Sequence, residues 1–149
     1  MMKVGFIGLG NVGGKLSGSL LRNGTDLTVH DLNDELVSDF VSRGAKRTDG
    51  PAALMRDCDA VITCLPSPAA SAAVMDEMLP EITAGKIWME MSTTDEAEVK
   101  RLGAMVMDRG GAAVDCPVSG GCHPAAPGNI SIFAGCDPAT FHTPAPFLH

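Results

Sequence analysis

Short apolar runs alternate with amphipathic segments along the whole chain. Residues 3–8 and 26–30 have the apolar or alternating character of buried strands, whereas Val12, Leu16 and Leu20 recur at helical spacing within residues 11–23. The same rhythm continues beyond them. Further strands are expected over residues 45–48, 59–65, 86–91, 112–116 and 130–134, and further helices over residues 33–42, 51–56, 69–78, 95–109 and 138–148.

Several helix ends carry their own signals. Asn33 is a good N-cap for the second helix, and Pro51 suits the first turn of the third. Thr93 or Thr94 is expected to cap the helix over residues 95–109. Strands that alternate with helices require right-handed crossovers, so the pattern predicts an α/β fold with a doubly wound, mostly parallel sheet. A length of 149 residues suits one domain spanning residues 1–149.

Composition narrows the classes of ligand. The chain is 45% hydrophobic and 19% charged, as in an ordinary globular protein, and its formal net charge is −7. Its eleven Lys and Arg are scattered among eighteen acids, without the basic stripe of a nucleic-acid-binding protein. Nucleic acid is therefore not an expected partner. An anionic ligand could still bind through backbone N–H groups.

Neither a membrane nor a metal is expected as a partner. The chain has no run of about 18 apolar residues and no apolar signal core, so we expect a protein without a membrane span. Its five cysteines are odd in number and form no CxxC pair, which favours reduced thiols in the cytoplasm. Cys116, Cys122 and His123 match no familiar zinc spacing.

A glycine-rich turn follows the first expected strand. Residues 8–13 read Gly-Leu-Gly-Asn-Val-Gly, the G-x-G-x-x-G pattern, and they open the first expected helix. Gly8 permits the tight turn, Gly10 lets the backbone approach a diphosphate, and Gly13 lets the helix pack close to the strand. The diphosphate would then lie on free N–H groups at the helix N-terminus. This context predicts a dinucleotide site of the Rossmann type.

An acid at the end of the second strand indicates which dinucleotide the site binds. Asp31 lies 18 residues after Gly13, near the offset at which a carboxylate accepts the hydroxyls of the adenosine ribose. The same charge repels a 2′-phosphate, and the next residue is Leu32 rather than an arginine. NAD is therefore expected over NADP.

Further motifs, taken with the glycine-rich turn, point to a family. The opening over residues 4–13, the Cys64-Leu65-Pro66 segment and the Ser92-Thr93-Thr94 segment resemble the β-hydroxyacid dehydrogenases, the family of 3-hydroxyisobutyrate dehydrogenase, although Val12 stands where the family usually has methionine. The resemblance implies that Leu65 and Pro66 border the nicotinamide side and that Thr93 approaches the nicotinamide half. The expected cofactor contacts are Gly8, Leu9, Gly10, Asn11, Val12, Gly13, Asp31, Leu65, Pro66 and Thr93.

A second signature bears on the substrate. Residues 115–121, Asp-Cys-Pro-Val-Ser-Gly-Gly, with Ala125, Gly128 and Gly135 after them, resemble the family's substrate-binding signature. The resemblance implies that Ser119, Gly120 and Gly121 hold the substrate carboxylate, and a glycine-rich turn can aim several amides at one anion. His123 fills a variable slot, either as an exposed loop residue or as a substrate contact.

The family's catalytic lysine has no counterpart here. In the family it lies beyond this domain, near the start of an all-helical second domain. The last lysine of the chain is Lys100, which precedes the substrate signature. No catalytic residue is therefore expected within the chain, which is expected to be inactive alone. It is either a fragment of a longer dehydrogenase or a natural short protein.

The resemblance implies hydride transfer between NAD and a small 3-hydroxy acid by the intact protein. The signature lacks the acidic pair of 6-phosphogluconate dehydrogenases, which favours a substrate of the 3-hydroxyisobutyrate or tartronate semialdehyde type. An apolar face left without the helical domain also favours a homo-oligomer. The alternative is a non-catalytic dinucleotide-binding or sensor module that is complete at this length.

Overall fold

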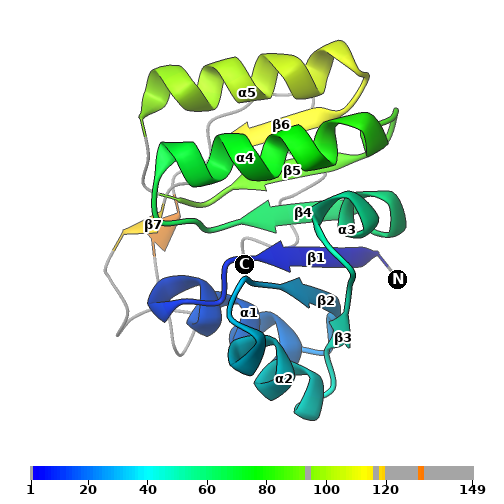
Figure 1. Ribbon diagram of the computed structural model, residues 1–149, viewed down its shortest axis with the longest axis vertical. Helices are drawn as coiled ribbons and strands as arrows, with labels where there is room; N and C mark the ends of the chain where they lie inside the picture. The colour runs from blue at the N-terminus through cyan, green and yellow to red at the C-terminus, as the bar shows by residue number, and fades with distance from the viewer. Residues whose placement is uncertain (1, 93–94, 116–117, 120–130, 133–149) are drawn as a thin grey trace.

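A six-stranded sheet forms the centre of the protein (Figure 1). The computed structural model describes residues 2–92, 95–115, 118–119 and 131–132. The strands of the sheet are β1 (Lys3–Ile7), β2 (Asp26–His30), β3 (Lys46–Arg47), β4 (Ala60–Thr63), β5 (Ile87–Glu90) and β6 (Ala112–Asp115). Their order is β3-β2-β1-β4-β5-β6, and every neighbouring pair is parallel.

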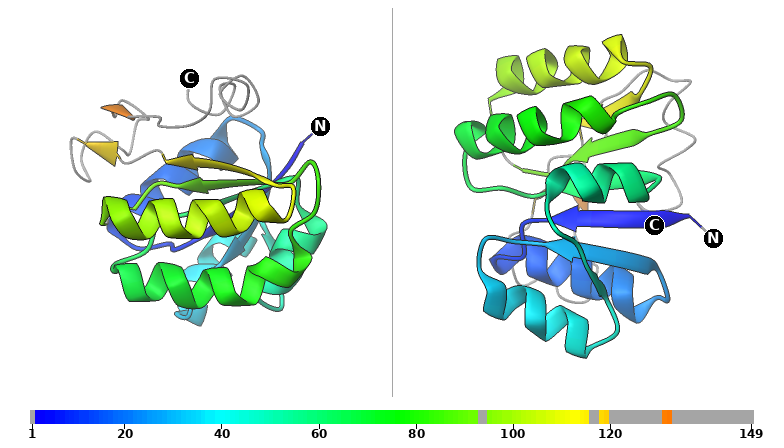
Figure 2. Two further views of the ribbon diagram at one scale, coloured as in Figure 1. Left: turned by 90° about the horizontal axis from the view of Figure 1, so that it is seen from above. Right: turned by 45° about the vertical axis from the view of Figure 1, so that its right-hand side comes forward.

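Helices cover both faces of this sheet (Figure 2). One face carries α1 (Asn11–Arg22) and α2 (Asp34–Ser42). The other carries α3 (Pro51–Asp57), α4 (Pro68–Met78), the short 3₁₀ helix η1 (Leu79–Glu81) and α5 (Glu96–Asp108). The expected doubly wound α/β architecture of the Rossmann type is confirmed, because the apolar strands need a helical layer on each side.

Alternate strand residues enter two separate cores. Phe6 packs with the residues under α1 and α2, whereas its neighbour Ile7 packs with those under α3, α4 and α5. Trp88 is 1% exposed in the second core. Burying one large apolar side chain stabilises a fold by roughly 1.5–3 kcal/mol. The sheet is therefore fixed from both faces, and its carboxyl edge has a rigid support.

Side chains cap the N-termini of α2, α4 and α5, in one case through a residue other than the expected one. Asn33 accepts a hydrogen bond from the Glu35 amide at 3.0 Å, as predicted. The cap of α5 is Asp95, whose Oδ1 accepts from the Ala97 amide at 3.1 Å, so the assignment to Thr93 or Thr94 was wrong. Asp is as good an N-cap as Thr, and the helix begins later than its sequence pattern suggested.

Two short strands form a separate ribbon. β7 (Val118–Ser119) and β8 (Ser131–Ile132) pair antiparallel with each other. The strand expected over residues 130–134 therefore exists in part, but its partner lies in a segment expected to be a loop. An apolar pattern predicts that a segment is extended, but it does not predict which other strand the segment pairs with. The helix expected over residues 138–148 lies outside the described residues.

The strand order reverses between β1 and β4. From β1 the chain moves outward through β2 and β3, then returns to the other side of β1 for β4, β5 and β6. The loops that follow β1 and β4 consequently leave the sheet in opposite directions. In open α/β sheets, the divergence of the loops at such a switch point forms the crevice in which ligands bind.

Candidate functional site

The loop between β1 and α1 can be built only with glycine at two positions. Gly8 has φ of +102°, and a Cβ on it would lie 2.1 Å from the carbonyl oxygen of Cys64. A Cβ on Gly13 would lie 1.9 Å from the carbonyl oxygen of Gly8. The loop therefore passes directly against the end of β4, and the first turn of α1 packs directly against the loop. These are the roles that the sequence predicted for the two residues.

Gly10 differs from both, because its missing side chain faces open space. Among the described residues, and leaving aside its chain neighbours and its own helix, no heavy atom lies within 4 Å of an ideal Cβ at this position. Gly10 is the N-cap of α1, and no side chain caps the helix. The helix has no acid in its first turn, and its first backbone bond runs from the Gly14 amide to the Gly10 carbonyl at 2.7 Å. Asn11, Val12 and Gly13 precede that bond, so their amides are available to an anion.

Asp31 joins the glycine loop to the end of β2. Its Oδ2 accepts the Leu9 amide at 2.7 Å, and its Oδ1 accepts the Asn33 amide at 2.8 Å. These two bonds fix the carboxylate beside the loop and leave each oxygen able to accept another donor. The Leu9 side chain is buried in the core under α1, so the backbone of Leu9 rather than its side chain belongs to the site.

The segment after β4 forms the other side of the crevice. Leu65 is half-buried and Pro66 is exposed. A Cβ on Gly8 would lie 3.3 Å from Leu65 Cδ2, so the Leu65 side chain lies against the glycine loop. The Leu65 amide donates to Ser92 Oγ at 2.6 Å. The ends of β1, β4 and β5 thus lie side by side at this edge of the sheet.

The thiol of Cys64, at this same edge, is held neutral. Burial, together with the smaller effect of the neighbouring Glu90 carboxylate, raises the pKa of Cys64 to about 11. Because the thiolate is the nucleophile, alkylation by iodoacetamide at pH 8 should be about 100-fold slower at Cys64 than for a thiol with a pKa of 9. Site-resolved mass spectrometry measures this rate, which should rise about tenfold per pH unit up to pH 11.

The urea-unfolded chain is the control, since its Cys64 should react at the rate of an ordinary thiol. Rapid labelling of Cys64 in the folded chain at pH 8 would show that this edge of the sheet is more open than described.

A buried carboxylate that was not among the residues predicted from the sequence lies behind this edge. Glu90 is 0% exposed at the end of β5. Its Oε1 accepts from Thr63 Oγ1 at 3.0 Å and from the Ser92 amide at 3.0 Å, while its Oε2 accepts from Ser71 Oγ at 2.8 Å. Thr63 in turn accepts from Trp88 Nε1 at 3.0 Å. The signal that could have found it is a single acid inside an otherwise apolar strand, because buried charges require partners.

Asp115, at the end of β6, pairs in register with Glu90. Burial raises the pKa of Asp115, and the carboxylates of Glu90 and Glu96 raise it further. The substrate signature therefore begins at a carboxyl group that is less acidic than usual, on the edge shared by β4, β5 and β6.

Other predicted site residues lie outside the described part of the chain. Thr93, Gly120 and Gly121 are not described, and of Ser119 only the backbone, in β7, is described. Cys116, Cys122 and His123 are likewise outside it. Their predicted roles stay predictions.

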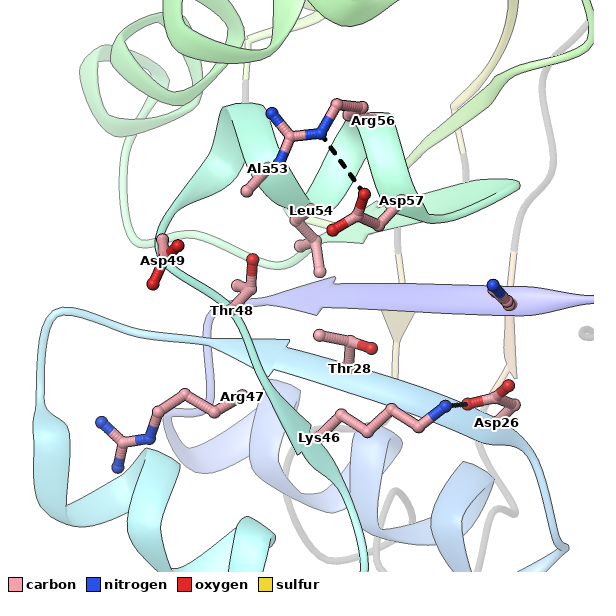
Figure 3. Close-up of a pocket in the computed structure, with 11 residues that line it drawn as sticks. Asp26, Thr28, Lys46, Arg47, Thr48, Asp49, Ala53, Leu54, Arg56 and Asp57 are labelled. Atoms are coloured by element: carbon pink, nitrogen blue, oxygen red, sulfur yellow. Dashed lines mark hydrogen bonds and ion pairs between the residues drawn. The ribbon is translucent and has the colours of Figure 1, made fainter.

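A cavity of about 460 Å³ lies elsewhere, on the face of β2 between β3 and α3 (Figure 3). It is lined by Lys3, Asp26, Thr28, Lys46, Arg47, Thr48, Asp49, Ala53, Leu54, Arg56 and Asp57. None of the described cofactor residues is among them. Three of its cations are already paired, Lys46 with Asp26 at 2.9 Å, Arg47 with Asp34 at 2.6 Å and Arg56 with Asp57 at 3.3 Å. β3 has only two residues, so the edge of the sheet leaves this face open.

The described residues bring together no group of three His, Cys, Asp or Glu side chains able to hold a metal. Within the same part of the chain, no helix is long and apolar enough to cross a bilayer.

The arrangement at the crevice has two chemical capacities. The uncapped turn of α1 offers backbone amides and a positive dipole end to an anion, with Gly10 leaving room for close approach. The fixed carboxylate of Asp31, on the neighbouring strand, can accept hydroxyl groups. A ligand that carries both a diphosphate and a diol fits this pair.

Comparisons with known proteins agree with that geometry. The family described as the NAD binding domain of 6-phosphogluconate dehydrogenase matches residues 3–149. Glyoxylate/succinic semialdehyde reductase 1 of Arabidopsis thaliana is 34% identical over 148 residues, which cover 97% of this chain and 51% of the plant protein.

Solved structures share the fold. A structure of Mycobacterium tuberculosis 3-hydroxyisobutyrate dehydrogenase with L-serine superimposes with a TM-score of 0.93 at 26% identity, covering 99% of this chain and 51% of that one. Psf3, in complex with NADP+ and 2-OPP, gives a TM-score of 0.89 at 29% identity, covering 97% of this chain and 52% of Psf3. The chain thus spans about half the length of these proteins.

Proposed function

Because the chain belongs to the family of the NAD-binding domain of 6-phosphogluconate dehydrogenase, we propose that it binds NAD as the dinucleotide-binding domain of a dehydrogenase for small 3-hydroxy acids. The observation that carries this proposal is the open approach at Gly10, over an uncapped helix N-terminus and beside the fixed carboxylate of Asp31. The family resemblance seen in the sequence is confirmed by the match over residues 3–149.

The residues present fit a nicotinamide dinucleotide. The amides of Asn11, Val12 and Gly13 would hold its diphosphate, where an added Cβ at Gly10 would intrude. Asp31 would accept the adenosine ribose hydroxyls, and Leu65 with Pro66 would border the nicotinamide half. The cofactor, when bound, supplies or takes up the hydride, and the chain binds and orients it.

Asp31 supports the preference for NAD over NADP. Its carboxylate is held in place by the amides of Leu9 and Asn33, so it cannot turn away from a 2′-phosphate without breaking two hydrogen bonds. Leu32 is 98% exposed and offers no charge. Arg47, a cation on the neighbouring strand β3, is itself held by Asp34 at 2.6 Å and Ser38 at 3.0 Å.

We expect calorimetric titration to give at least about tenfold tighter binding of NADH than of NADPH, because like charges in contact cost several kcal/mol and tenfold requires about 1.4 kcal/mol. The Asp31→Ser variant should lose most of this preference, since it keeps a hydroxyl and removes the charge. Asp39→Ser, which removes one acid from the exposed surface of α2, is the matched control and should keep the preference.

Equal binding of both cofactors by the unaltered chain would overturn the assignment of Asp31. Loss of the preference in Asp39→Ser as well would show that net charge, rather than this carboxylate, sets it.

For the substrate half we propose a 3-hydroxy acid of the 3-hydroxyisobutyrate or tartronate semialdehyde type, with Ser119, Gly120 and Gly121 holding its carboxylate. The proton donor of the reaction, a lysine in this family, would lie outside these 149 residues. We also propose a cytoplasmic homo-oligomer. The exposed Met107 on α5 supports association, and the free thiols of Cys58 and Cys64 support a reducing compartment.

A further inference from the structure

The buried carboxylate of Glu90 connects three parts of the fold. It receives hydrogen bonds from Thr63 on β4, Ser71 on α4 and the backbone of Ser92 just after β5. Among the described residues all of these donors are neutral. A fully buried carboxylate without a cation is costly, and it is tolerated only when its oxygens are well satisfied. An apolar residue would suit the core better, so the position calls for a reason beyond packing.

The bonds continue from Glu90 to the rim of the crevice. Oε1 holds the Ser92 amide at 3.0 Å, and the Ser92 hydroxyl accepts the Leu65 amide at 2.6 Å. Ser92 is 3% exposed, so water does not compete for these bonds. The chain of contacts thus joins the end of β5 to the segment after β4, at the side of the crevice opposite Asp31.

We propose that Glu90 and Ser92 form a clamp that positions the Leu65–Pro66 segment for the nicotinamide half of the cofactor. This inference rests on the proposed function. Glu90 is a positioning residue, since it touches the rim only through Ser92. Asp31 and the Gly8–Gly13 loop form the adenosine and diphosphate side. The bonds of the clamp do not involve them, although Gly8 lies against the Cys64–Leu65 segment.

Substitutions at two serines of the same network can distinguish a role in positioning the Leu65–Pro66 segment from a purely structural role. Ser92 and Ser71 are both 3% exposed, and each hydroxyl makes a hydrogen bond within the network. Only Ser92 reaches the rim. Ser71 ties Glu90 Oε2 to α4, away from Leu65. Changing either to alanine should lower stability to a similar extent, so stability alone does not distinguish them.

The readout is the binding of two ligands, NADH and ADP-ribose, which lacks the nicotinamide ring. Ser92→Ala should weaken NADH binding about tenfold and leave ADP-ribose binding within twofold, measured by calorimetry. Ser71→Ala should leave the ratio of the two dissociation constants within twofold of the unaltered chain. Glu90→Gln keeps an oxygen for the Ser92 amide and should therefore leave the ratio of the NADH dissociation constant to the ADP-ribose dissociation constant unchanged. Glu90→Met removes that oxygen and should raise this ratio, as Ser92→Ala does.

The outcomes separate the clamp from the function on which it rests. Equal ratios in Ser92→Ala and Ser71→Ala overturn the clamp while leaving NAD binding in place. Absence of both NADH and ADP-ribose binding in the unaltered chain overturns the proposed function and the clamp with it. If Ser92→Ala does not fold, Ser92→Cys preserves the shape with a weaker acceptor, and an unchanged ratio in that variant overturns the clamp.

Discussion

Replacing Gly10 with valine should abolish measurable NADH binding while the protein stays folded. Within the described part of the chain, and apart from its chain neighbours and its own helix, no heavy atom lies within 4 Å of an added Cβ at Gly10, so the protein leaves room for a side chain there. That side chain meets the ligand instead, because a diphosphate bound to the first turn of α1 requires close approach to this backbone. We expect an affinity loss of at least about 100-fold, equivalent to about 2.7 kcal/mol, by calorimetric titration.

Gly50 provides the matched control for this change. It is the N-cap of α3 as Gly10 is of α1, and in the part of the chain that the structure describes an added Cβ on it likewise meets no heavy atom within 4 Å. Gly50→Val therefore repeats any cost of valine at an N-cap without approaching the crevice. It should bind NADH as the unaltered chain does. Unchanged NADH affinity in Gly10→Val would show that the diphosphate does not lie on α1.

Replacing Gly13 with alanine should damage the fold as well as the site. A Cβ there would lie 1.9 Å from the carbonyl oxygen of Gly8, a backbone atom that cannot rotate away. The glycine loop or the helix must shift, and overpacking of this kind costs about 1–3 kcal/mol, occasionally more. We expect the free energy of unfolding in urea to fall by about 3 kcal/mol, with NADH binding lost.

Gly18→Ala is the control on the same helix. Its Cβ would meet Arg43 Nη2 at 3.0 Å, the far end of a flexible side chain. Alanine is the better helix former by about 1 kcal/mol, so this variant should be as stable as the unaltered chain or more so. A Gly13→Ala variant with full stability would contradict the close packing of α1 on the loop.

The sequence predicted the geometry of the turn between β1 and α1, and the place of Asp31 beside it, because these signals are local. Gly8, Gly10 and Gly13 occur at a fixed spacing between a strand and a helix, and each of the three glycines has its own structural role there. Asp31 follows the second strand directly, so the parallel pairing of β1 with β2 carries it to the loop. The contacts of Gly13 with Gly8, and of Asp31 with Leu9, follow from this local order.

The features that the sequence did not predict depend on distant partners. The role of Glu90 arises only when β4, α4 and β5 are assembled, since its donors lie 27 and 19 residues away or on its own strand end. β7 was missed because a two-residue strand carries no periodicity. The cap of α5 was misplaced because Asp95 and the threonines before it are all acceptable caps, and propensity cannot choose among them.

Backbone amide chemical shifts of the ¹⁵N-labelled chain during an NADH titration will show whether NAD binds at the carboxyl edge of β1, β2 and β4. If it does, the largest changes should fall on residues 9–13, on Asp31 and Leu32, and on Leu65. Little change is expected around Thr28, Lys46 and Ala53, which line the cavity on the other side of β2. Changes centred on that cavity, or none at all at saturating NADH, would rule out binding at the carboxyl edge.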